Sequence, residues 1–438
     1  MNVLFRFQVV LFTFLFSFWG KSVTAQTYFP PVNSSQWDTL YPNRLQFCPD
    51  RIDSLYQFLE GSNSKAFILL KDGKIVLERY FGRFTQDSVW YWASAGKTLT
   101  AGLIGIVESK KQLAISDAAS LYLGSGWTSL SKLREDSITI WHQLTMTSGL
   151  DESDNPDCTD PSCLTYTAPV GTRWSYHNAP YTRLDQVIES ASGQKINAFL
   201  AQQLSVKTGI NGLYVRLGYN NVFFSKARSM ARFGWLLLNK GQWSGNQIIP
   251  ELFVSQMAQT SQILNPSYGY LTWLNGKSHH MLPGLPFRFI GALSPPAPND
   301  AYAALGKNGQ MLQIIPSKNM VWMRMGESPD DKNPLVSVTY ADEVWNYINA
   351  LNCENAAVEG IPGKNNIDLY PNPVVRGGYI QFSTFLTSEM DIYDVYGRLW
   401  AQVNTGSESF RIPENWPVGC YVAVPKNGQR AQRFVVIP

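Results

Sequence analysis

The sequence predicts an α/β (α+β) fold, in which an antiparallel sheet is flanked by helices and carries an inserted helical region, followed by a small all-β sandwich. Strand patterns lie near both ends of residues 26–353, and largely helical or loop-rich sequence fills the middle. Both ends are therefore expected to contribute strands to one antiparallel sheet. Beyond residue 366 the pattern changes to short alternating strands separated by Gly, Asn and Pro, which is typical of a sandwich.

Length and charge limit the function classes. The chain has 438 residues, a formal net charge of +3 and 16% charged residues. Two or three folding units are expected at this length. The charge provides no basic field for a nucleic acid or a membrane surface, so the expected partners are small molecules or short peptides. The 14 tryptophans favour well-filled cores and aromatic walls around a cleft.

Residues 1–25 have the pattern of a secretory signal peptide. Arg6 precedes an apolar run that ends at Trp19, and the small residues Val23 and Ala25 precede an expected cut before Gln26. A membrane anchor is disfavoured because the run is shorter than the roughly 20 residues of a span. No span is expected after removal of the signal. The protein is thus expected to leave through the periplasm and to be secreted or held at the cell surface.

Export permits disulfides. Cys158 and Cys163 are close enough for a small loop staple. Cys48 precedes one helical pattern and Cys353 ends another, which fits a bridge between packed terminal helices. Cys420 then remains unpaired in a strand pattern. Four cysteines allow three connectivities, so this pairing stays open. Neither a CxxC motif nor a His/Cys cluster argues for a metal, and no cofactor is expected.

The elements follow in order along the chain. DRIDSLYQFLE is the first helical pattern, and AFILLKDGKIVLERYF is two strands joined by Asp72-Gly73, a strong hairpin signal. Strand patterns return in YGYLTWL, YAALGKNGQMLQIIP and MVWMRMG, before a helix that ends at Cys353. ENAAVEGIPGKNN, residues 354–366, has the composition of a linker. Residues 367–438 form the predicted sandwich and hold no cluster of acids, bases or nucleophiles.

One serine–lysine pair differs from the others. Ser94 and Lys97 open the apolar stretch TLTAGLIGIV, where a helix places both side chains on one face. Helix position and burial both disfavour the charged lysine. A neutral lysine can take the proton of a serine hydroxyl, which is otherwise a poor nucleophile. The same spacing recurs in polar stretches, where solvated residues are the expected interpretation: Ser62 with Lys65, Ser129 with Lys132, and Ser192 with Lys195.

A second segment, GTRWSYHNAPYTRL, supplies a phenol and an amide. Tyr176 and Asn178 follow a turn and precede a helix. A Tyr-x-Asn triplet is frequent by chance, and a turn with a capping Asn is the alternative interpretation. Beside a Ser/Lys pair, the phenol can relay the proton to the leaving group while the amide orients lysine and substrate. His177, between them, is expected to be exposed.

A third segment, ALGKNGQMLQIIP, supplies the candidate substrate contacts. Lys307 and the two residues after it begin what is expected to be an edge strand. Gly309 would let a substrate carbonyl approach the backbone closely. The N–H of Gln310 would then be a second oxyanion donor beside that of Ser94.

These three segments, in this order, resemble the penicillin-recognising serine hydrolases, especially class C β-lactamases, D,D-carboxypeptidases and related esterases and amidases. ITIWHQLTMTSGLD and YGYLTWL resemble the 6-aminohexanoate-dimer hydrolase branch. The resemblance covers roughly Phe47 to Cys353. It implies that Ser94 is acylated, that Lys97 is its base, that Tyr176 relays the proton, and that Asn178 and Lys307 contact substrate. Asn308 departs from the Thr or Ser of the β-lactamases.

The C-terminal unit resembles the sorting domain of type IX secretion cargo. IDLYPNPV, MDIYDVYGRLW and VGCYVAV followed by RFVVIP carry this resemblance. It implies recognition by the type IX machinery through residues 367–438, passage across the outer membrane, and release or attachment at the surface. A carbohydrate-binding or adhesive sandwich is the alternative, but no exposed aromatic platform supports it.

The sequence thus predicts an exported serine hydrolase that cleaves small esters or amides through a Ser94 acyl-enzyme. One alternative is a β-lactamase or D,D-carboxypeptidase acting on β-lactams or peptidoglycan peptides. Another is a catalytically inactive peptide-binding surface protein. A Ser-His-Asp site is disfavoured because no Gly-x-Ser-x-Gly elbow occurs. Aromatic side chains beside the motifs are expected to line the cleft and to favour an apolar acyl group: Trp92, Trp174 and Trp273, with Tyr91 and Tyr270.

Overall fold

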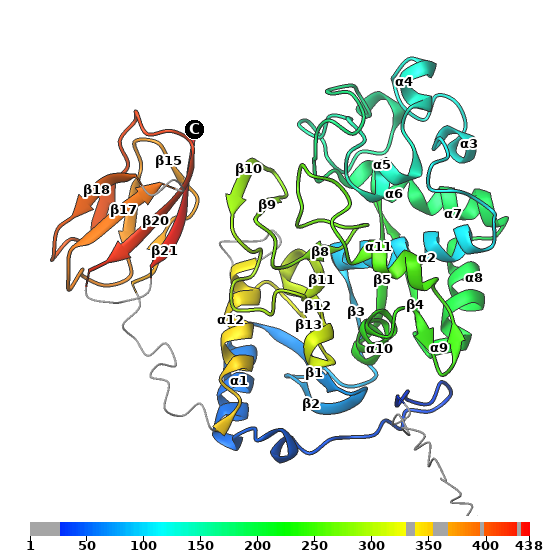
Figure 1. Cartoon of the computed structure of the whole chain (residues 1–438), viewed down its shortest axis with the longest axis horizontal. Helices are drawn as coiled ribbons and strands as arrows, with labels where there is room; N and C mark the ends of the chain where they lie inside the picture. The colour runs from blue at the N-terminus through cyan, green and yellow to red at the C-terminus, as the bar shows by residue number, and fades with distance from the viewer. Residues whose placement is uncertain (1–26, 330–337, 354–366, 395–397, 427–430) are drawn as a thin grey trace, which may run out of the picture.

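The computed structural model describes residues 27–329, 338–353, 367–394, 398–426 and 431–438 (Figure 1). The predicted signal peptide and linker lie outside the described residues. Within the described ranges, no helix is both long and apolar enough to cross a membrane.

A six-stranded antiparallel sheet forms the centre of the main body, as the sequence predicts. Its order is β2-β1-β13-β12-β11-β8, so strands from both ends of residues 26–353 lie side by side. The β1–β2 turn contains Asp72 and Gly73, both with positive φ, as the hairpin signal requires. The strands are β1 Ser64–Lys71, β2 Lys74–Tyr80, β8 Trp273–Leu274, β11 Tyr302–Gly306, β12 Gln310–Ile315 and β13 Met320–Gly326.

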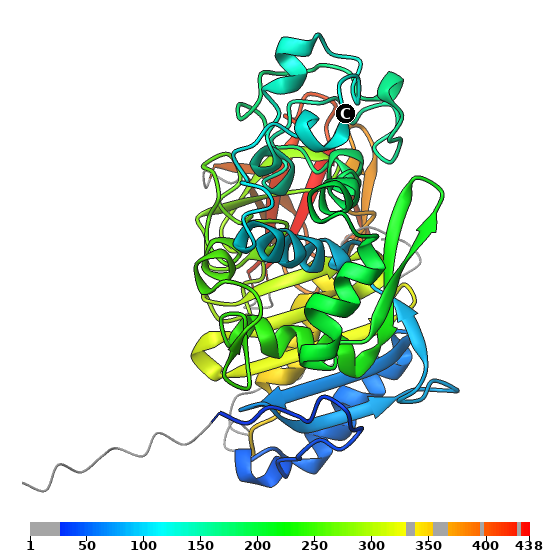
Figure 2. The same ribbon diagram turned by 90° about the vertical axis from the view of Figure 1, so that its right-hand side faces the viewer.

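Helices cover both faces of this sheet (Figure 2). α10 (Ala227–Leu238) packs Gly234 against Val321, whereas α12 (Val338–Asn349) packs Trp345 against Trp322 at 5.7 Å between ring centroids. Successive residues of a strand point to opposite faces, so the two helices lie on opposite sides. α1 (Pro49–Gly61) pairs with α12, since Phe58 stacks on Tyr347 at 4.5 Å.

Both expected disulfides are present. Cys48–Cys353 joins the start of α1 to the chain after α12, and Cys158–Cys163 closes a small loop. Cys420 is free and buried.

The inserted region is helical, as expected, and also contains a sheet that the sequence pattern did not indicate. This sheet has the order β3-β5-β4, with β3 Val89–Tyr91, β4 Gly212–Leu217 and β5 Asn220–Lys226. The helical elements here are η2 Ala93–Ala95, α2 Gly96–Ser109, α3 Ser120–Leu123, α4 Lys132–Asp136, α5 Ile140–Leu144, η3 Pro161–Cys163, α6 Asn178–Thr182, α7 Leu184–Ser192, α8 Ile196–Leu200, η4 Ala201–Ser205 and α9 Val206–Thr208.

Short elements complete the main body. They are η1 Pro42–Leu45, β6 Gln242–Trp243, β7 Asn246–Gln247, α11 Glu251–Met257, β9 His279–Leu282, β10 Leu285–Ile290, η5 Lys307–Gly309 and η6 Pro316–Lys318. The strands β9 and β10 form a hairpin of their own.

The C-terminal region is all β, with two sheets around its own apolar core. One sheet has the order β14-β16-β19 and the other β15-β21-β20-β17-β18. Phe289 of the β9–β10 hairpin packs with Cys420 and Val435 of the sandwich. Arg433 also lies 5.7 Å from the Phe289 ring centroid. The strands are β14 Leu369–Tyr370, β15 Val374–Val375, β16 Tyr379–Phe382, β17 Met390–Asp394, β18 Leu399–Val403, β19 Ser409–Arg411, β20 Gly419–Pro425 and β21 Gln432–Ile437.

Candidate active site

Ser94 lies in a sharp turn between a strand and a helix. β3 ends at Tyr91, the single-turn helix η2 contains Ser94, and α2 follows at once. Ala93 has a φ of 47°, which is uncommon for a residue with a side chain. The backbone N–H of Trp92 donates to Phe223 O of β5 at 2.8 Å and so ties this turn to the small sheet. The turn therefore presents Ser94 at the N-terminal end of α2, where free backbone N–H groups can receive negative charge.

Lys97 is in hydrogen-bonding contact with Ser94, with 3.0 Å between Nζ and Oγ. The lysine is 3% exposed. Its Nζ lies 4.9 Å from the ring centroid of Tyr176 and 4.3 Å from that of Tyr181. Burial lowers the pKa of Lys97 to about 7, and the negative charge of Asp157 opposes this change. At neutral pH a large fraction of Lys97 is therefore uncharged and able to accept a proton.

Tyr176 forms the other side of this pair. Its hydroxyl is buried and has no hydrogen-bond partner among the described residues. Burial raises the pKa of Tyr176 and the nearby Ser94 hydroxyl opposes the rise, so the phenol keeps its proton at neutral pH. Trp273 stacks on the Tyr176 ring at 5.9 Å, and Trp174 lies at 6.4 Å. Both tryptophans are below 5% exposed, so they support Tyr176 from behind and present no open wall.

Trp92 is not a cleft wall, and here the sequence-based prediction was wrong. Its side chain is fully buried, and its Nε1 donates to Ser225 Oγ at 2.8 Å. It packs against Phe223 and Phe233, at 4.9 and 5.9 Å between ring centroids. The reversal of the chain at Ala93 explains this, because it turns Trp92 into the core while Ser94 stays accessible. Tyr270 is also buried, against Phe253.

Asn178 is the first residue of α6 and is held by a carboxylate. Its Nδ2 donates to Asp157 Oδ1 at 2.7 Å, whereas its Oδ1 is buried without a partner among the described residues. His177 is 2% exposed, so the expectation of an exposed histidine was wrong. Burial lowers the pKa of His177 to about 4 and keeps the ring neutral at physiological pH.

The segment 307–310 is a turn between two interior strands, and the expected edge strand was wrong. β12 lies between β13 and β11. Asn308 and Gly309 both have positive φ, 61° and 68°, which makes this Asn-Gly pair a hairpin turn. Lys307 is exposed at its start. The Gln310 carboxamide points to β13, where its Nε2 donates to Gly326 O at 2.6 Å and its Oε1 accepts from Gly326 N at 3.1 Å.

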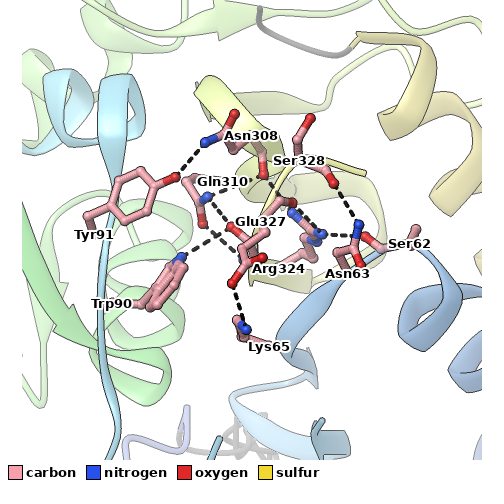
Figure 3. A network of polar contacts seen from close by, with 11 residues as sticks. Ser62, Asn63, Lys65, Trp90, Tyr91, Asn308, Gln310, Arg324, Glu327 and Ser328 are labelled. Carbon is pink, nitrogen blue, oxygen red and sulfur yellow. Dashed lines mark hydrogen bonds and ion pairs between the residues drawn. The ribbon is translucent and has the colours of Figure 1, made fainter. Parts of the chain in front are cut away.

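Arg324 fixes this turn from below (Figure 3). The guanidinium is fully buried and donates to the carbonyls of Asn308 and Gly309, at 2.7 and 3.1 Å. It also donates to Ser62 O and to Ser64 Oγ. A Cβ on Gly309 would come within 2.7 Å of Arg324 Nη1. The glycine therefore makes room for the arginine, and the predicted role of Gly309 in admitting a substrate carbonyl is not what its surroundings indicate.

The strand that leads into Ser94 contacts this turn and the end of β13. Asn308 Nδ2 donates to the Tyr91 hydroxyl at 2.7 Å, and Trp90 Nε1 donates to Gly326 O at 3.1 Å (Figure 3). Both aromatic residues belong to β3, which leads into Ser94. The Tyr91 contact couples the position of the 307–309 turn to that of the serine.

Gly306 is the glycine that approaches Ser94. A Cβ at this position would come within 2.6 Å of Trp92 O, 2.9 Å of Ala95 N and 3.1 Å of Ser94 N. The end of β11 therefore lies directly against the Ser94 turn. An added side chain would force the two segments apart.

Sequence reasoning missed four residues of this neighbourhood: Asp157, Tyr181, Gly306 and Arg324. Two of them left a signal. Arg324 is a single charge inside the apolar run MVWMRMG, and Gly306 ends an apolar strand. Asp157 and Tyr181 left none, because their proximity to Lys97 depends on how the inserted region folds. In the described ranges, no group of three or more His, Cys, Asp or Glu side chains could hold a metal ion.

The architecture is that of the β-lactamase and transpeptidase fold, with mixed helices, antiparallel sheets and an added C-terminal all-β region. A family model described as Beta-lactamase matches residues 57–335, more than half of the chain. The chain therefore belongs to the β-lactamase family, whose members are serine hydrolases.

Two solved structures share this fold, and one further protein is similar in sequence. A putative 6-aminohexanoate-dimer hydrolase from Bacillus anthracis has a TM-score of 0.57 and 20% identity, covering 74% of this chain and 91% of its own. A putative β-lactamase from Bacteroides dorei has a TM-score of 0.56 and 16% identity, covering 70% and 99%. An uncharacterised protein of Alkalihalophilus pseudofirmus is 24% identical over 346 residues, 70% of this chain and 94% of its own.

Proposed function

We propose that this protein is an exported serine hydrolase that cleaves small ester or amide substrates through a Ser94 acyl-enzyme. The observation that carries the proposal is the contact between Lys97 and Ser94. A lysine that is 3% exposed, with a pKa lowered to about 7, lies 3.0 Å from a serine hydroxyl at the start of a helix. A buried base in contact with a hydroxyl is what serine activation requires.

Acylation begins when neutral Lys97 takes the Ser94 proton as Oγ attacks the substrate carbonyl. A bond forms between Oγ and the carbonyl carbon, and the leaving-group bond breaks as the tetrahedral intermediate collapses. The proton passes from Lys97 through the Tyr176 hydroxyl to the leaving oxygen or nitrogen. Water then attacks the acyl carbon, the bond between that carbon and Oγ breaks, and a proton of the water passes to Oγ of Ser94. The neutral phenol above Lys97 supports the relay role of Tyr176.

The oxyanion needs two backbone donors. One is the N–H of Ser94. The second lies on the segment that begins at Gly306, whose α-carbon rests against the serine turn. The N–H of Lys307 directly follows Gly306, and we propose it ahead of the N–H of Gln310, which lies across the turn.

The substrate we propose is a small ester or an amide-linked oligomer with a free carboxylate. Lys307 is exposed beside the site and can receive an anionic group. Asn308 occupies the position that would face a β-lactam carboxylate in the related enzymes. Here its side-chain amide donates to the Tyr91 hydroxyl. This favours esters and linear amides over β-lactams.

We also propose that residues 367–438 are a type IX sorting domain and that residues 1–25 are a signal peptide. The sandwich has its own apolar core, and the two disulfides suit an oxidising compartment. The test is secretion of the full chain, compared with a chain that ends at Cys353, in a host with a type IX system. Equal export of both chains would remove the sorting role.

Two measurements test the hydrolase. First, a serine-directed phosphonate should label Ser94, located by mass spectrometry of the digested protein. Second, a panel should span p-nitrophenyl esters, a linear amide dimer with a free carboxylate, a D-Ala–D-Ala peptide and a cephalosporin reporter. We expect ester or linear amide turnover. Efficient turnover of the cephalosporin or the D,D-peptide alone would make this a β-lactamase or carboxypeptidase. A chain that binds peptide but reacts with nothing would be an inactive binding protein.

A further inference from the structure

The segment directly before the Cys158–Cys163 disulfide lies on the first turn of α6, beside the proposed catalytic groups. Asp157, directly before Cys158, accepts the 2.7 Å hydrogen bond from Asn178 Nδ2. One residue away, the backbone N–H of Ala179 donates to Pro156 O at 3.1 Å. These two adjacent contacts hold residues 156 and 157 on α6, close to Tyr176 in the sequence.

We propose that Asp157, held in place by the Cys158–Cys163 disulfide, is a positioning residue that orients the Asn178 amide and supplies the negative charge facing Lys97. This inference rests on the proposed function for its catalytic meaning. Its structural content, the orientation of Asn178 and the charge state of Lys97, can be tested without any substrate.

The orientation follows from hydrogen-bond chemistry. A carboxylate accepts and cannot donate, so the Asn178 atom that faces Asp157 must be Nδ2. Oδ1 then points elsewhere, and it is buried without a partner among the described residues. It is therefore held ready to accept from an N–H group, either of Lys97 or of a substrate. Without Asp157 the amide could rotate by half a turn and present a donor in that place.

The charge follows from what surrounds Lys97. Ser94 and the rings of Tyr176 and Tyr181 contact it, and none of these groups carries a charge at neutral pH. Asp157 is the carboxylate whose field reaches the lysine, where it partly offsets the effect of burial. A charge in this position stabilises Lys97 after it has taken the serine proton. The stability of protonated Lys97 during the reaction thus depends on Asp157, the residue directly before the disulfide loop.

The disulfide matters because it constrains the backbone next to Asp157. It spans five positions in sequence, so loop entropy gives it about 2 kcal/mol of global stability, the low end for a disulfide. Its other effect is local, on residues 158–163 and on the carboxylate that precedes them. Breaking it should therefore lower the melting temperature by a few degrees and should also act on the active site.

The test compares Asp157→Asn with Asp154→Asn, an exposed acid of the same loop that makes the same change in net charge. In protein with 13C at the lysine ε-carbons, NMR follows the titration of Lys97, whose resonance is identified by its loss in Lys97→Met. We expect Asp157→Asn to move the Lys97 midpoint to lower pH, because a stabilising negative charge is gone. Asp154→Asn should leave it unchanged. Equal midpoints in the two variants would overturn the proposal.

Kinetics supply the second readout. With whichever substrate the panel finds, Asp157→Asn should lower kcat by about tenfold at its own optimum, about 1.4 kcal/mol of barrier, and shift the acid limb of the rate profile to lower pH. KM should change less. The double variant Cys158→Ser/Cys163→Ser should also lower kcat and shift the acid limb to lower pH, by more than its loss of a few degrees in melting temperature explains. A loss that tracks unfolding, with an unchanged pH profile, would show a merely structural loop. If Ser94 is not labelled and no substrate is cleaved, the proposed function fails, but the NMR titration still decides this inference.

Discussion

Gly306, the last residue of β11, lies with its α-carbon against the backbone of Ser94. A single methyl group at Gly306 would reach to 3.1 Å from Ser94 N and to 2.6 Å from Trp92 O. The close approach brings the start of the 307–309 turn to the serine. It also explains why this position tolerates no side chain, although the backbone of Gly306 is in an extended conformation that any residue can adopt.

Gly306→Ala should therefore reduce hydrolysis by at least about 100-fold, the range reported for losing one oxyanion donor. The methyl group has to push β11 away from Ser94, which disturbs the oxyanion geometry. The matched control is Gly234→Ala in α10, where a Cβ would meet Val321 and Leu312 at 2.6 and 2.7 Å, away from Ser94. Activity and melting temperature are measured for both. A control that loses as much activity per folded molecule would show that the effect of Gly306 is general destabilisation.

The rate should depend on the protonation of Lys97. Its pKa is lowered to about 7, so the neutral base is scarce below that pH and abundant above it. We expect kcat/KM to rise with pH through an inflection near 7. Lys97→Arg should abolish this limb and cost several orders of magnitude in turnover, because a guanidinium stays protonated. Near-normal acylation of Ser94 in this variant, measured by phosphonate labelling, would exclude lysine as the base.

The same burial should make Lys97 costly for stability. Its pKa is about 7 when folded against an ordinary value of 10.5, so the unfolded chain binds more protons between these values. Stability from this group therefore rises with pH across that window. Lys97→Met should raise the free energy of unfolding at pH 6 by several kcal/mol, since the difference between the two pKa values corresponds to about 5 kcal/mol, and the gain should shrink toward pH 10. Urea unfolding at several pH values measures it. A gain that is independent of pH would show that the lysine is not neutral in the fold.

Arg324 should matter far more than the ion pair drawn near it in Figure 3. Arg324→Met removes the arginine donor from the carbonyls of Ser62, Asn308 and Gly309, of which Asn308 O still accepts from Gln310 Nε2 at 3.2 Å, so we expect a loss of ~3 kcal/mol or more. Lys65 and Glu327 are 2.8 Å apart but 32% and 57% exposed, and Lys65→Met should cost under ~1 kcal/mol. Denaturant unfolding compares the two. Equal losses would contradict the assigned role of Arg324.

The sandwich should be dispensable for hydrolysis. A chain that ends at Cys353 retains the Cys48–Cys353 disulfide and every proposed catalytic residue, so we expect it to fold and keep full activity.

In the intact protein, Cys420 is buried against Phe289, and burial raises its pKa to about 11, so a thiol reagent should react slowly. Phe289→Asp should speed that reaction and leave hydrolysis unchanged. Loss of activity on truncation, with an unchanged melting temperature, would mean that the sandwich contributes to the site.

Local patterns in the sequence were sufficient for the fold class and for the contact between Ser94 and Lys97. Alternating apolar residues around Asp72-Gly73 predict the β1–β2 hairpin, and strand signals at both ends predict the shared sheet. Ser94 and Lys97 are three residues apart on one helix turn, so their contact is decided by local geometry. Terminal helical patterns beside Cys48 and Cys353 likewise indicated the bridge that the structure contains.

Tertiary contacts decided the rest of the site. Asn308-Gly309 carries a hairpin signal. The signal does not show that the two strands of the hairpin are interior, because that depends on the pairing of β12 with β13 and of β11 with β8. The contact of Arg324 with the turn likewise depends on the position of β13. Trp92 lies only two residues before Ser94 and yet is buried, because the positive φ of Ala93 reverses the chain between them. Asp157 comes near Lys97 through a loop seated on α6, and periodicity cannot reveal such a contact. Residues within one helical turn meet by local geometry, whereas residues on separate segments meet only where packing brings those segments together.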